Sequence, residues 1–281
     1  MSPRPAAHAL VTDLALARRL ERAEGGSNAA CVEAHAARRP QSGAAWCDIG
    51  GTYAMFDGVG SPLTQTFGLG LFSPPSDADF GALEDFFQSR GAGVFHEVSP
   101  LAHPSLLETL RARRYHPIEL STVLHLPLGG SATPAAGLRA PSPGLTTRRV
   151  GGDELAAWTE TSALGWGETP ELGSFVREYG ATLGAARGVS CFVAELDGRM
   201  IAAGALSVQG DIALLAGAST IPAWRGRGAQ GALLRARLEH ARGVGCELAM
   251  MAAAPGSTSQ CNAERAGFRV AYTRTKWALA V

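Results

Sequence analysis

The chain lacks an excess of charge of either sign. Its 281 residues carry 25 Lys and Arg against 25 Asp and Glu, so the formal net charge at pH 7 is zero. A protein without a net positive field has no long-range attraction for nucleic acid or for an anionic membrane surface. The composition therefore favours neither of these partners.

Cysteine pairs, metal-ligand spacings and long apolar runs are also missing. Neither a disulfide framework nor a zinc site is indicated, because the cysteines show no C-x-x-C spacing and the seven histidines show no H-x-x-x-H spacing. Asp13, Arg18 and Arg19 interrupt the first apolar stretch, so we expect neither a signal peptide nor a membrane anchor. Isolated thiols suit a reducing compartment, and we expect a cytoplasmic protein. The five cysteines are Cys31, Cys47, Cys191, Cys246 and Cys261.

Enough apolar material is present for two cores. The hydrophobic fraction is 46% and the charged fraction 18%, which argues against disorder. Residues 131–144 are rich in Gly, Pro, Ser and Ala, a composition that cannot build a core and indicates a linker. The sequence therefore predicts one domain over residues 1–130 and a second over residues 145–281.

The second domain shows alternating signals for helices and strands. Asp153 is a suitable helix N-cap, Pro170 suits a first helical turn, and Asp197-Gly198 marks a hairpin. Near the end, an apolar run over 247–253 is typical of a buried strand. The expected order is strand 146–150, helices 153–163 and 170–186, strands 190–196, 200–208 and 212–220, a helix that ends near Gly243, strand 247–253, helix 259–266, and a strand pair over 268–279.

A short glycine-rich loop carries the strongest chemical signal. Arg225-Gly226-Arg227-Gly228 lies between an apolar strand and an amphipathic helix, where main-chain amides and the helix dipole form an anion site. The two glycines permit positive φ and close approach, while the two arginines supply charged donors. A pyrophosphate is the ligand that this arrangement suits best.

The second domain resembles the GNAT superfamily of N-acetyltransferases. Arg225 and Gly228, and the place of the loop, match the family's Arg/Gln-x-x-Gly-x-Gly/Ala signature between its fourth strand and third helix. The likeness continues through the apolar strand Leu248–Ala253 and the late helix that ends in Gly267-Phe268, and it covers about the last half of the chain. Gln230 departs from the small residue at the last signature position; its side chain either points away or adds a donor.

The resemblance implies an α/β fold with a mixed, mostly antiparallel central sheet flanked by helices, and acetyl-coenzyme A (acetyl-CoA) as the cofactor. Main-chain groups on the splayed fourth strand would pair with the pantetheine arm, and the amides from Arg227 to Gly231 would hold the pyrophosphate. Asn262 either contacts the cofactor or caps the late helix. The implied cofactor residues are Ala218, Ser219, Thr220, Arg225, Gly226, Arg227, Gly228, Ala229, Gln230, Gly231 and Asn262.

The catalytic groups are harder to identify. Direct attack of an amine on a thioester needs a base for the ammonium proton and an acid for the thiolate. Many family members have a tyrosine just before the Gly-Phe pair, but this chain has Ala263-Glu264-Arg265-Ala266 there. Tyr272 is the candidate acid, or a buried sheet tyrosine; Glu168 is the candidate base in the acceptor loop, or an exposed helix cap. Cys261 has no histidine partner nearby, which favours a packing role.

The first domain echoes the second. Strand 67–71, helix 79–89, strand 93–98, helix 104–113 and strand segments 115–116 and 121–126 follow one another in a similar order. Residues 72–77 have prolines and an acid where amides would have to face a phosphate. We therefore expect a degenerate tandem copy without a phosphate loop, which covers the acceptor cleft or packs on its partner; an unrelated fold is the alternative.

The predicted function is an N-acetyltransferase that acetylates a small-molecule or peptide amine as a monomer or homodimer. Its acceptor pocket would involve residues 158–169 and the first domain. Two alternatives remain: a non-catalytic acyl-CoA sensor, and a nucleotide-phosphate binding protein. The second alternative is disfavoured because no Lys-Ser or Lys-Thr pair follows the glycines.

Overall fold

The computed structural model describes residues 11–129, 137–167 and 170–280. The elements of the first half are α1 (Leu14–Arg38), η1 (Pro40–Ser42), β1 (Ala45–Ile49), β2 (Thr52–Phe56), β3 (Gln65–Phe67), α2 (Asp77–Gln88), β4 (Phe95–Val98), α3 (Ser105–Ala112) and β5 (Tyr115–Pro127). Those of the second half are β6 (Thr146–Arg149), η2 (Gly152–Glu154), α4 (Leu155–Gly165), α5 (Pro170–Ala185), β7 (Val189–Leu196), β8 (Arg199–Gln209), β9 (Ile212–Thr220), η3 (Pro222–Trp224), α6 (Ala229–Gly243), β10 (Leu248–Ala253), α7 (Thr258–Arg265) and β11 (Arg269–Leu279).

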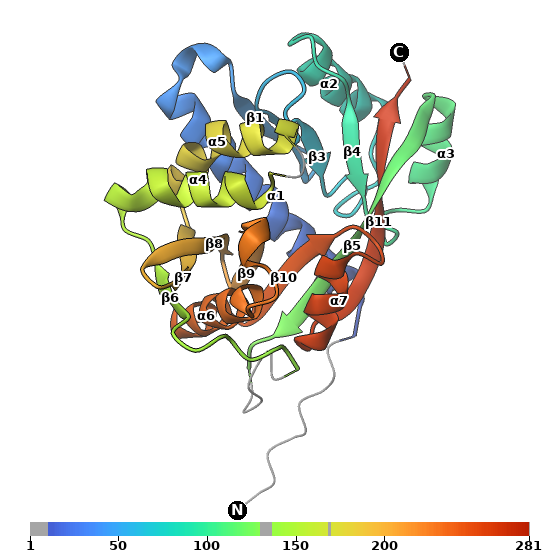
Figure 1. Cartoon of the computed structure of the whole chain (residues 1–281). Coiled ribbons are helices and arrows are strands. Elements are labelled where there is room, and N and C mark those ends of the chain that lie inside the picture. Colours follow the sequence, from blue (N-terminus) through green and yellow to red (C-terminus); the bar gives the residue numbers. More distant parts are fainter. Residues whose placement is uncertain (1–10, 130–136, 168–169, 281) are drawn as a thin grey trace, which may run out of the picture.

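All strands join one sheet with helices on both faces (Figure 1). The strand order is β1-β2-β3-β4-β11-β5-β10-β9-β8-β7-β6. Two ladders, β3 with β4 and β9 with β10, are parallel, and the other ladders are antiparallel. The mixed, mostly antiparallel sheet that the sequence predicts is confirmed.

Each half supplies a central strand to the other half. β5 comes from the first half but lies between β10 and β11, and β11 comes from the second half but lies between β4 and β5. Figure 1 shows the two strands, green and red, side by side in the middle of the sheet. The continuous sheet therefore crosses the division expected at residues 131–144.

The helices form two layers, as the alternation of side chains along the strands shows. In β7, Val193 packs with Trp158 of α4, whereas its neighbour Phe192 packs with the α6 side. In β9, Leu214 faces α1 and Leu215 faces α6. The layer on one face consists of α1, α4 and α5, and the layer on the other of α2, α3, α6 and α7.

Most predicted elements of the second half are confirmed, with two corrections. Asp153 lies inside the turn η2, and the N-cap of α4 is Glu154, so Asp153 is not its cap. The predicted strand pair over 268–279 is a single strand, β11, whose antiparallel partner β5 comes from the first half. The prediction paired two strands within this segment. In the structure the whole segment pairs with β5, which is more than a hundred residues away in the sequence.

The first half differs more from the prediction. The strand expected over 67–71 ends at Phe67, because Gly68 and Gly70 adopt positive φ values of 83° and 73°. The segments 115–116 and 121–126 belong to one strand, β5. Helix α1 and the strands β1 and β2 have no counterpart in the sequence-based prediction.

Candidate functional site

Strands β9 and β10 separate part of the way along their length. Their parallel ladder ends at the pair Leu214 and Met250, although β9 runs on to Thr220 and β10 to Ala253. Beyond this point each strand presents an edge with main-chain donors and acceptors toward the other. The opening between them can accept an extended ligand that pairs as an additional strand.

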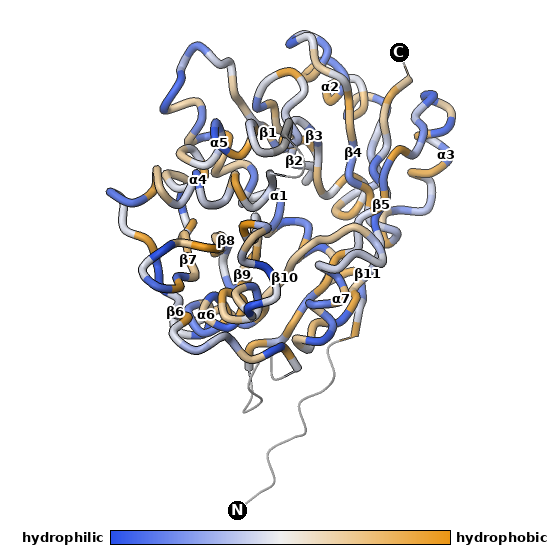
Figure 2. Tube along the Cα trace, in the orientation of Figure 1, coloured by the Kyte–Doolittle hydropathy of each residue, from blue (hydrophilic) through white to orange (hydrophobic). Residues whose placement is uncertain are grey.

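The glycine loop lies where β9 leads into α6. Gly226 and Gly228 have φ values of 77° and 80°, as expected from the sequence, and Gly228 is the N-cap of α6. Among the residues that the structure describes, no side chain caps this helix. Its first amides, which have no intrahelical partner, are therefore not bonded to a described capping side chain, and they stand at the positive end of the helix dipole. The helix itself is amphipathic (Figure 2), with Leu233 and Leu238 fully buried against the sheet.

Two side chains tie this loop to the end of β9. Gln230 donates from Nε2 to Thr220 Oγ1 at 2.9 Å, so the residue that departs from the family signature links α6 to β9. Arg225 donates to the main-chain oxygens of Thr220 and Gly165, each at 3.4 Å. These bonds show Arg225 holding the end of α4 beside the end of β9.

The C-terminus of α4 packs directly on β9. A Cβ atom added to Gly165 would lie 2.3 Å from Ser219 Oγ, so only glycine fits there. Ser219 donates from Oγ to the carbonyl oxygen of Ser162 at 2.9 Å. The side of β9 that carries Ser219 is therefore fixed by α4, and its main chain borders the opening.

The segment before β6 lies on the outside of the glycine loop. The Ser142 amide donates to the Arg227 carbonyl at 3.0 Å, and a Cβ on Gly228 would meet Ala140 O at 2.7 Å. Arg235 of α6 also donates to Leu138 O at 3.2 Å. Part of the segment that the sequence predicts as a linker thus packs against the candidate anion site.

Residues 155–268 match the model of the Acetyltransferase (GNAT) family. This segment is a GNAT-family domain. It contains the glycine loop, the opening between β9 and β10, and the helices on both sides of that opening. No curated protein matches the chain.

Solved structures extend the likeness of fold to the whole chain. A GCN5-related N-acetyltransferase from Kribbella flavida aligns with a TM-score of 0.68 at 16% identity, over 95% of this chain and 96% of that one. A tandem GNAT protein from the clavulanic acid biosynthesis pathway aligns with a TM-score of 0.59 at 18% identity, over 82% and 79% of the two chains. A GCN5-related N-acetyltransferase from Sphaerobacter thermophilus aligns at 0.54 and 17%, over 95% and 93%. The chain therefore has a tandem GNAT-like fold.

Tyr272 is buried on the face of the sheet that α1 covers. Its hydroxyl donates to Glu21 Oε1 at 2.9 Å, and it packs in the same apolar cluster as Leu214 and Met250, the last pair before the strands separate. Burial raises the pKa of Tyr272 well above its ordinary value, and Glu21 raises it further. Of the two alternatives that the sequence leaves open, this geometry agrees with a buried sheet tyrosine.

A buried ionic cluster adjoins Tyr272. Arg274 is 3% exposed; it donates to Glu24 at 2.7 Å and to Glu21 at 3.3 Å, and its Nε lies 2.9 Å from Glu97 as an ion pair. Burial raises the pKa of Glu21 to about 7, and Arg274 opposes part of this rise. Oε2 of Glu21 has no hydrogen-bond partner among the described residues. The cluster joins α1 to β4 and to the exchanged strand β11.

The other predicted residues have varied places. Glu168 lies outside the described residues. Asn262 lies in the middle of α7, where Oδ1 accepts from Arg265 at 3.1 Å, while Ser257 is the N-cap of that helix. The capping alternative for Asn262 is therefore wrong. Trp158, expected in the acceptor loop, is 1% exposed and donates to Phe192 O in the core.

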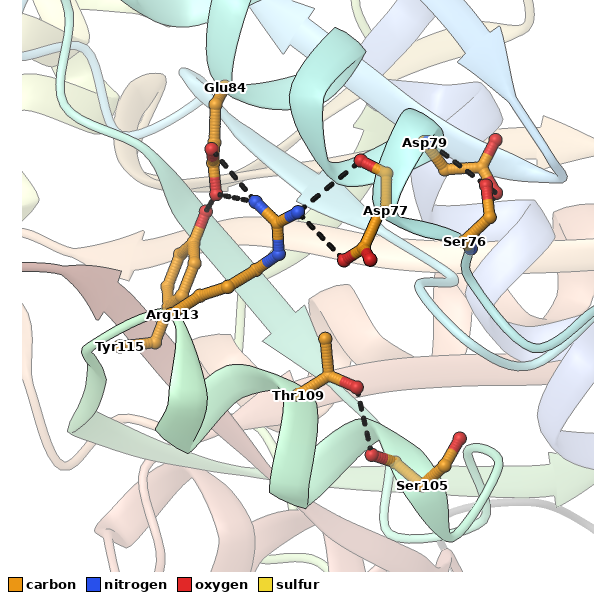
Figure 3. Close-up of polar contacts among 8 residues, drawn as sticks. All are labelled: Ser76, Asp77, Asp79, Glu84, Ser105, Thr109, Arg113 and Tyr115. Carbon is orange, nitrogen blue, oxygen red and sulfur yellow. Dashed lines mark hydrogen bonds and ion pairs between the residues drawn. The ribbon is translucent and has the colours of Figure 1, made fainter.

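In the first half, α2 takes the place that α6 has in the second half, and side chains cap its N-terminus. α2 follows β3 as α6 follows β9, but a capping box of Ser76 and Asp79 occupies its first amides (Figure 3). Arg113 of the segment after α3 bonds Asp77 and Glu84 of the same helix. Hydrogen bonds from Ser76 hold the pKa of Asp79 below its ordinary value. Carboxylates thus stand where a phosphate would have to bind.

A hollow of about 350 Å³ lies elsewhere, between α1, α5 and residues 57–61. It contains the pair His35 and Asp57, whose Nδ1 and Oδ1 atoms are 2.6 Å apart. None of the predicted cofactor residues lines it. In the described ranges no group of three or more His, Cys, Asp or Glu residues is placed to hold a metal ion, and no helix is long and apolar enough to span a membrane.

Proposed function

We propose that the GNAT domain binds acetyl-CoA and transfers its acetyl group to a primary amine of a small molecule or peptide. One observation carries the proposal: the opening between β9 and β10 leads to the uncapped N-terminus of α6. This arrangement offers strand-like pairing and an anion site in succession. The pantetheine arm and pyrophosphate of CoA require the same two features in the same order.

The chain's own residues would divide the binding work. Main-chain groups of Ala218, Ser219 and Thr220 would pair with the pantetheine arm, and the amides from Arg227 to Gly231, including Ala229, would hold the pyrophosphate. Arg227 is exposed and lies over Trp224, with its guanidinium carbon 5.0 Å from the ring centroid, so it can meet a phosphate. Arg225 and Gln230 would keep the loop in place through their bonds to β9.

The reaction forms an amide bond at the acceptor nitrogen and breaks the thioester C–S bond. Acetyl-CoA would supply the activated acetyl group. The ammonium would lose one proton to solvent before the attack, and the second proton, lost from the same nitrogen after the attack, would balance the proton gained by the thiolate. Main-chain amides beside the opening are the donors available to a developing oxyanion. We assign Tyr272 no step, because its hydroxyl is engaged with Glu21 on the α1 face.

We propose that residues 1–130 are a degenerate copy, 131–144 a connection and 145–281 the acetyl-CoA-binding copy. The closed start of α2 supports this division of labour, since carboxylates occupy the place of an anion there. The first copy would act as a scaffold that supplies β5 and α1 to the second.

A non-catalytic acyl-CoA sensor is the second candidate function. The observation that favours it is the absence of any titratable side chain on β9, from Ile212 to Thr220, combined with the engagement of Tyr272. A sensor would need the same cofactor residues but no base or acid. Turnover therefore separates the two candidates, whereas binding does not.

The loop assignment predicts that Arg227→Glu weakens acetyl-CoA binding by at least about 2 kcal/mol, because it puts a negative charge beside the pyrophosphate. Calorimetric titration measures this change. Arg111→Glu, at an exposed position on α3, is the matched control for charge reversal and should bind as the parent protein does. Equal affinities for the parent and a folded Arg227→Glu protein would refute the loop assignment.

Thiol release in the presence of a panel of primary amines then tests transfer. Amine-dependent release that Arg227→Glu removes would establish an acetyltransferase. Saturable binding without release from any amine in the panel would favour the sensor.

A further inference from the structure

A bulge distorts β9 close to the point where it leaves β10. The ladder with β8 pairs Ala203 with Ser219 but Ala205 with Ala216, so β9 contains one extra residue across this step. Gly217, inside the step, has a φ of 61°. Bulges bend a strand and leave main-chain groups without ladder partners. The bend here re-aims the free edge of β9.

Arg237 of α6 lies directly beneath this bulge. Its Nη1 donates to the carbonyl oxygens of Ala205 at 3.1 Å and Ala216 at 3.5 Å, one on each strand, and its Nε donates to Leu233 O at 3.2 Å. A Cβ added to Gly204, opposite the bulge, would lie 3.2 Å from the Arg237 guanidinium. The strand above the arginine therefore leaves just enough room for it.

The arginine is unusual because it is buried without a carboxylate. It is 3% exposed, and no charged partner among the described residues acts on it. Burial alone lowers the pKa of Arg237 to about 10, so the side chain remains charged near pH 7. A buried unpaired charge costs several kcal/mol, and an aliphatic residue would pack α6 on the sheet at a lower cost. Its bonds to the bulge are the compensation that the structure shows.

We propose that Arg237 is a positioning residue that fixes the β9 bulge and so sets the direction of the free edge, residues 215–220, along which acetyl-CoA would pair. The inference rests on the proposed function for its ligand. It adds that the geometry of this edge depends on a side chain beneath the strand, and not only on the glycine loop.

The test combines amide exchange with affinity. Arg237→Met keeps an unbranched side chain but removes the guanidinium donors, and it should raise hydrogen exchange over residues 215–220 at least about tenfold in the unliganded protein. The same variant should weaken acetyl-CoA binding about tenfold by calorimetry. Arg237→Lys retains a donor and should lie between Met and the parent in both measurements.

Two further variants separate geometry from charge. Arg235→Met removes a positive charge from the same helix. In the parent protein Arg235 donates to Leu138 and Arg139 and not to β9, so this variant should leave exchange in β9 unchanged. Gly204→Ala keeps all charges and displaces the Arg237 guanidinium, so it should loosen β9 in the same direction as Arg237→Met. If Arg237→Met does not fold, Gly204→Ala and Arg237→Lys decide the question.

The inference is overturned if folded Arg237→Met, or Gly204→Ala in its place, shows parental exchange in β9 and parental affinity. It is also overturned if Arg235→Met and Arg237→Met weaken binding equally while β9 exchange is parental in both variants, because the effect on binding is then one of charge. Loosening of β9 in a protein that never binds acetyl-CoA would reject the proposed function and leave the role of Arg237 at the bulge intact.

Discussion

At the scale of residues, two arginines, Arg237 and Arg274, bury a positive charge, and the structure compensates the two charges in different ways. Arg274 is surrounded by Glu21, Glu24 and Glu97, which together carry more negative charge than it can balance. Arg237 has main-chain oxygens in place of carboxylates. In the first case burial raises the pKa of Glu21, and the neighbouring carboxylates Glu24 and Glu97 add to the rise that Arg274 opposes.

The raised pKa of Glu21 predicts a dependence of stability on pH. Because the folded value of about 7 exceeds the ordinary value of 4.5, the fold binds this proton more tightly than the unfolded chain does. The stabilisation is complete below about pH 4.5 and is lost as the pH rises through about 7. Relative to the parent, Glu21→Gln should therefore gain stability between pH 5 and 8, on the order of 2 kcal/mol, measured by urea unfolding.

Glu239→Gln, at an exposed position on α6, is the control for removal of one carboxylate. Its unfolding midpoints should run parallel to those of the parent across this pH range. A parallel course for Glu21→Gln as well would mean that Glu21 is already ionised at pH 5.

Residue-level prediction succeeded best where a pattern carries its own chemistry. Gly226 and Gly228 are in the left-handed conformation that an anion loop requires. Arg237 was missed, although a signal was present: it lies three residues after Leu234 and four before Ala241, inside the apolar stripe of α6. A lone arginine in a buried stripe can equally reach the surface, so the sequence cannot distinguish the two arrangements.

At the scale of elements, the N-terminus of α6 is open and that of α2 is closed. The loop before α6 needs two left-handed residues, and only one of them touches another segment. A Cβ on Gly226 would meet nothing within 4 Å, whereas one on Gly228 would meet Ala140 and Pro141. The two positions therefore form a matched pair.

Gly226→Ala should cost about 1 kcal/mol of unfolding free energy, since only backbone strain opposes it. Gly228→Ala has the same strain and a contact of 2.7 Å with Ala140 O, so we expect a loss of at least about 2 kcal/mol. Chemical unfolding of both variants measures the difference. Equal losses would show that residues 140–141 move away at little cost in solution.

Helix α1 shows why some elements escaped prediction. It spans 25 residues, yet it contains Gly25-Gly26-Ser27-Asn28, a run of poor helix formers. Tertiary contacts explain the small residues, since a Cβ on Gly25 would lie 3.0 Å from the Tyr53 ring. Packing against β2 overrides the low helix propensity of these residues. A local sequence pattern does not predict such packing.

At the scale of the whole molecule, the two halves are interlocked through β5 and β11. Alternation and length predict that both segments are strands, but they say nothing about which strand lies beside which. Pairing over more than a hundred residues is decided by the complementarity of the two sheets. For this reason the order of the central strands could not be predicted from the sequence.

Interlocking predicts that residues 137–281 do not fold alone. Without β5, neither β10 nor β11 has its shared neighbour, and the apolar cluster beneath α1 loses Leu16 and Leu20 as well. We expect no cooperative thermal transition from this fragment, and recovery of one when residues 1–136 are co-expressed with it. Cleavage of the folded chain at a protease site inserted between residues 130 and 136 is the control and should leave the two pieces associated. A cooperative transition from the fragment alone would show that β5 is dispensable.

The exchange of strands also has a consequence for the order of synthesis. When the ribosome has completed β5, the strand that must separate it from β4 lies beyond residue 268. At ordinary rates of translation, β4 and β5 wait on the order of ten seconds with their facing edges unpaired. The rate of translation therefore sets how long the edges of β4 and β5 can pair wrongly in the nascent chain. In the folded protein β11 covers both edges.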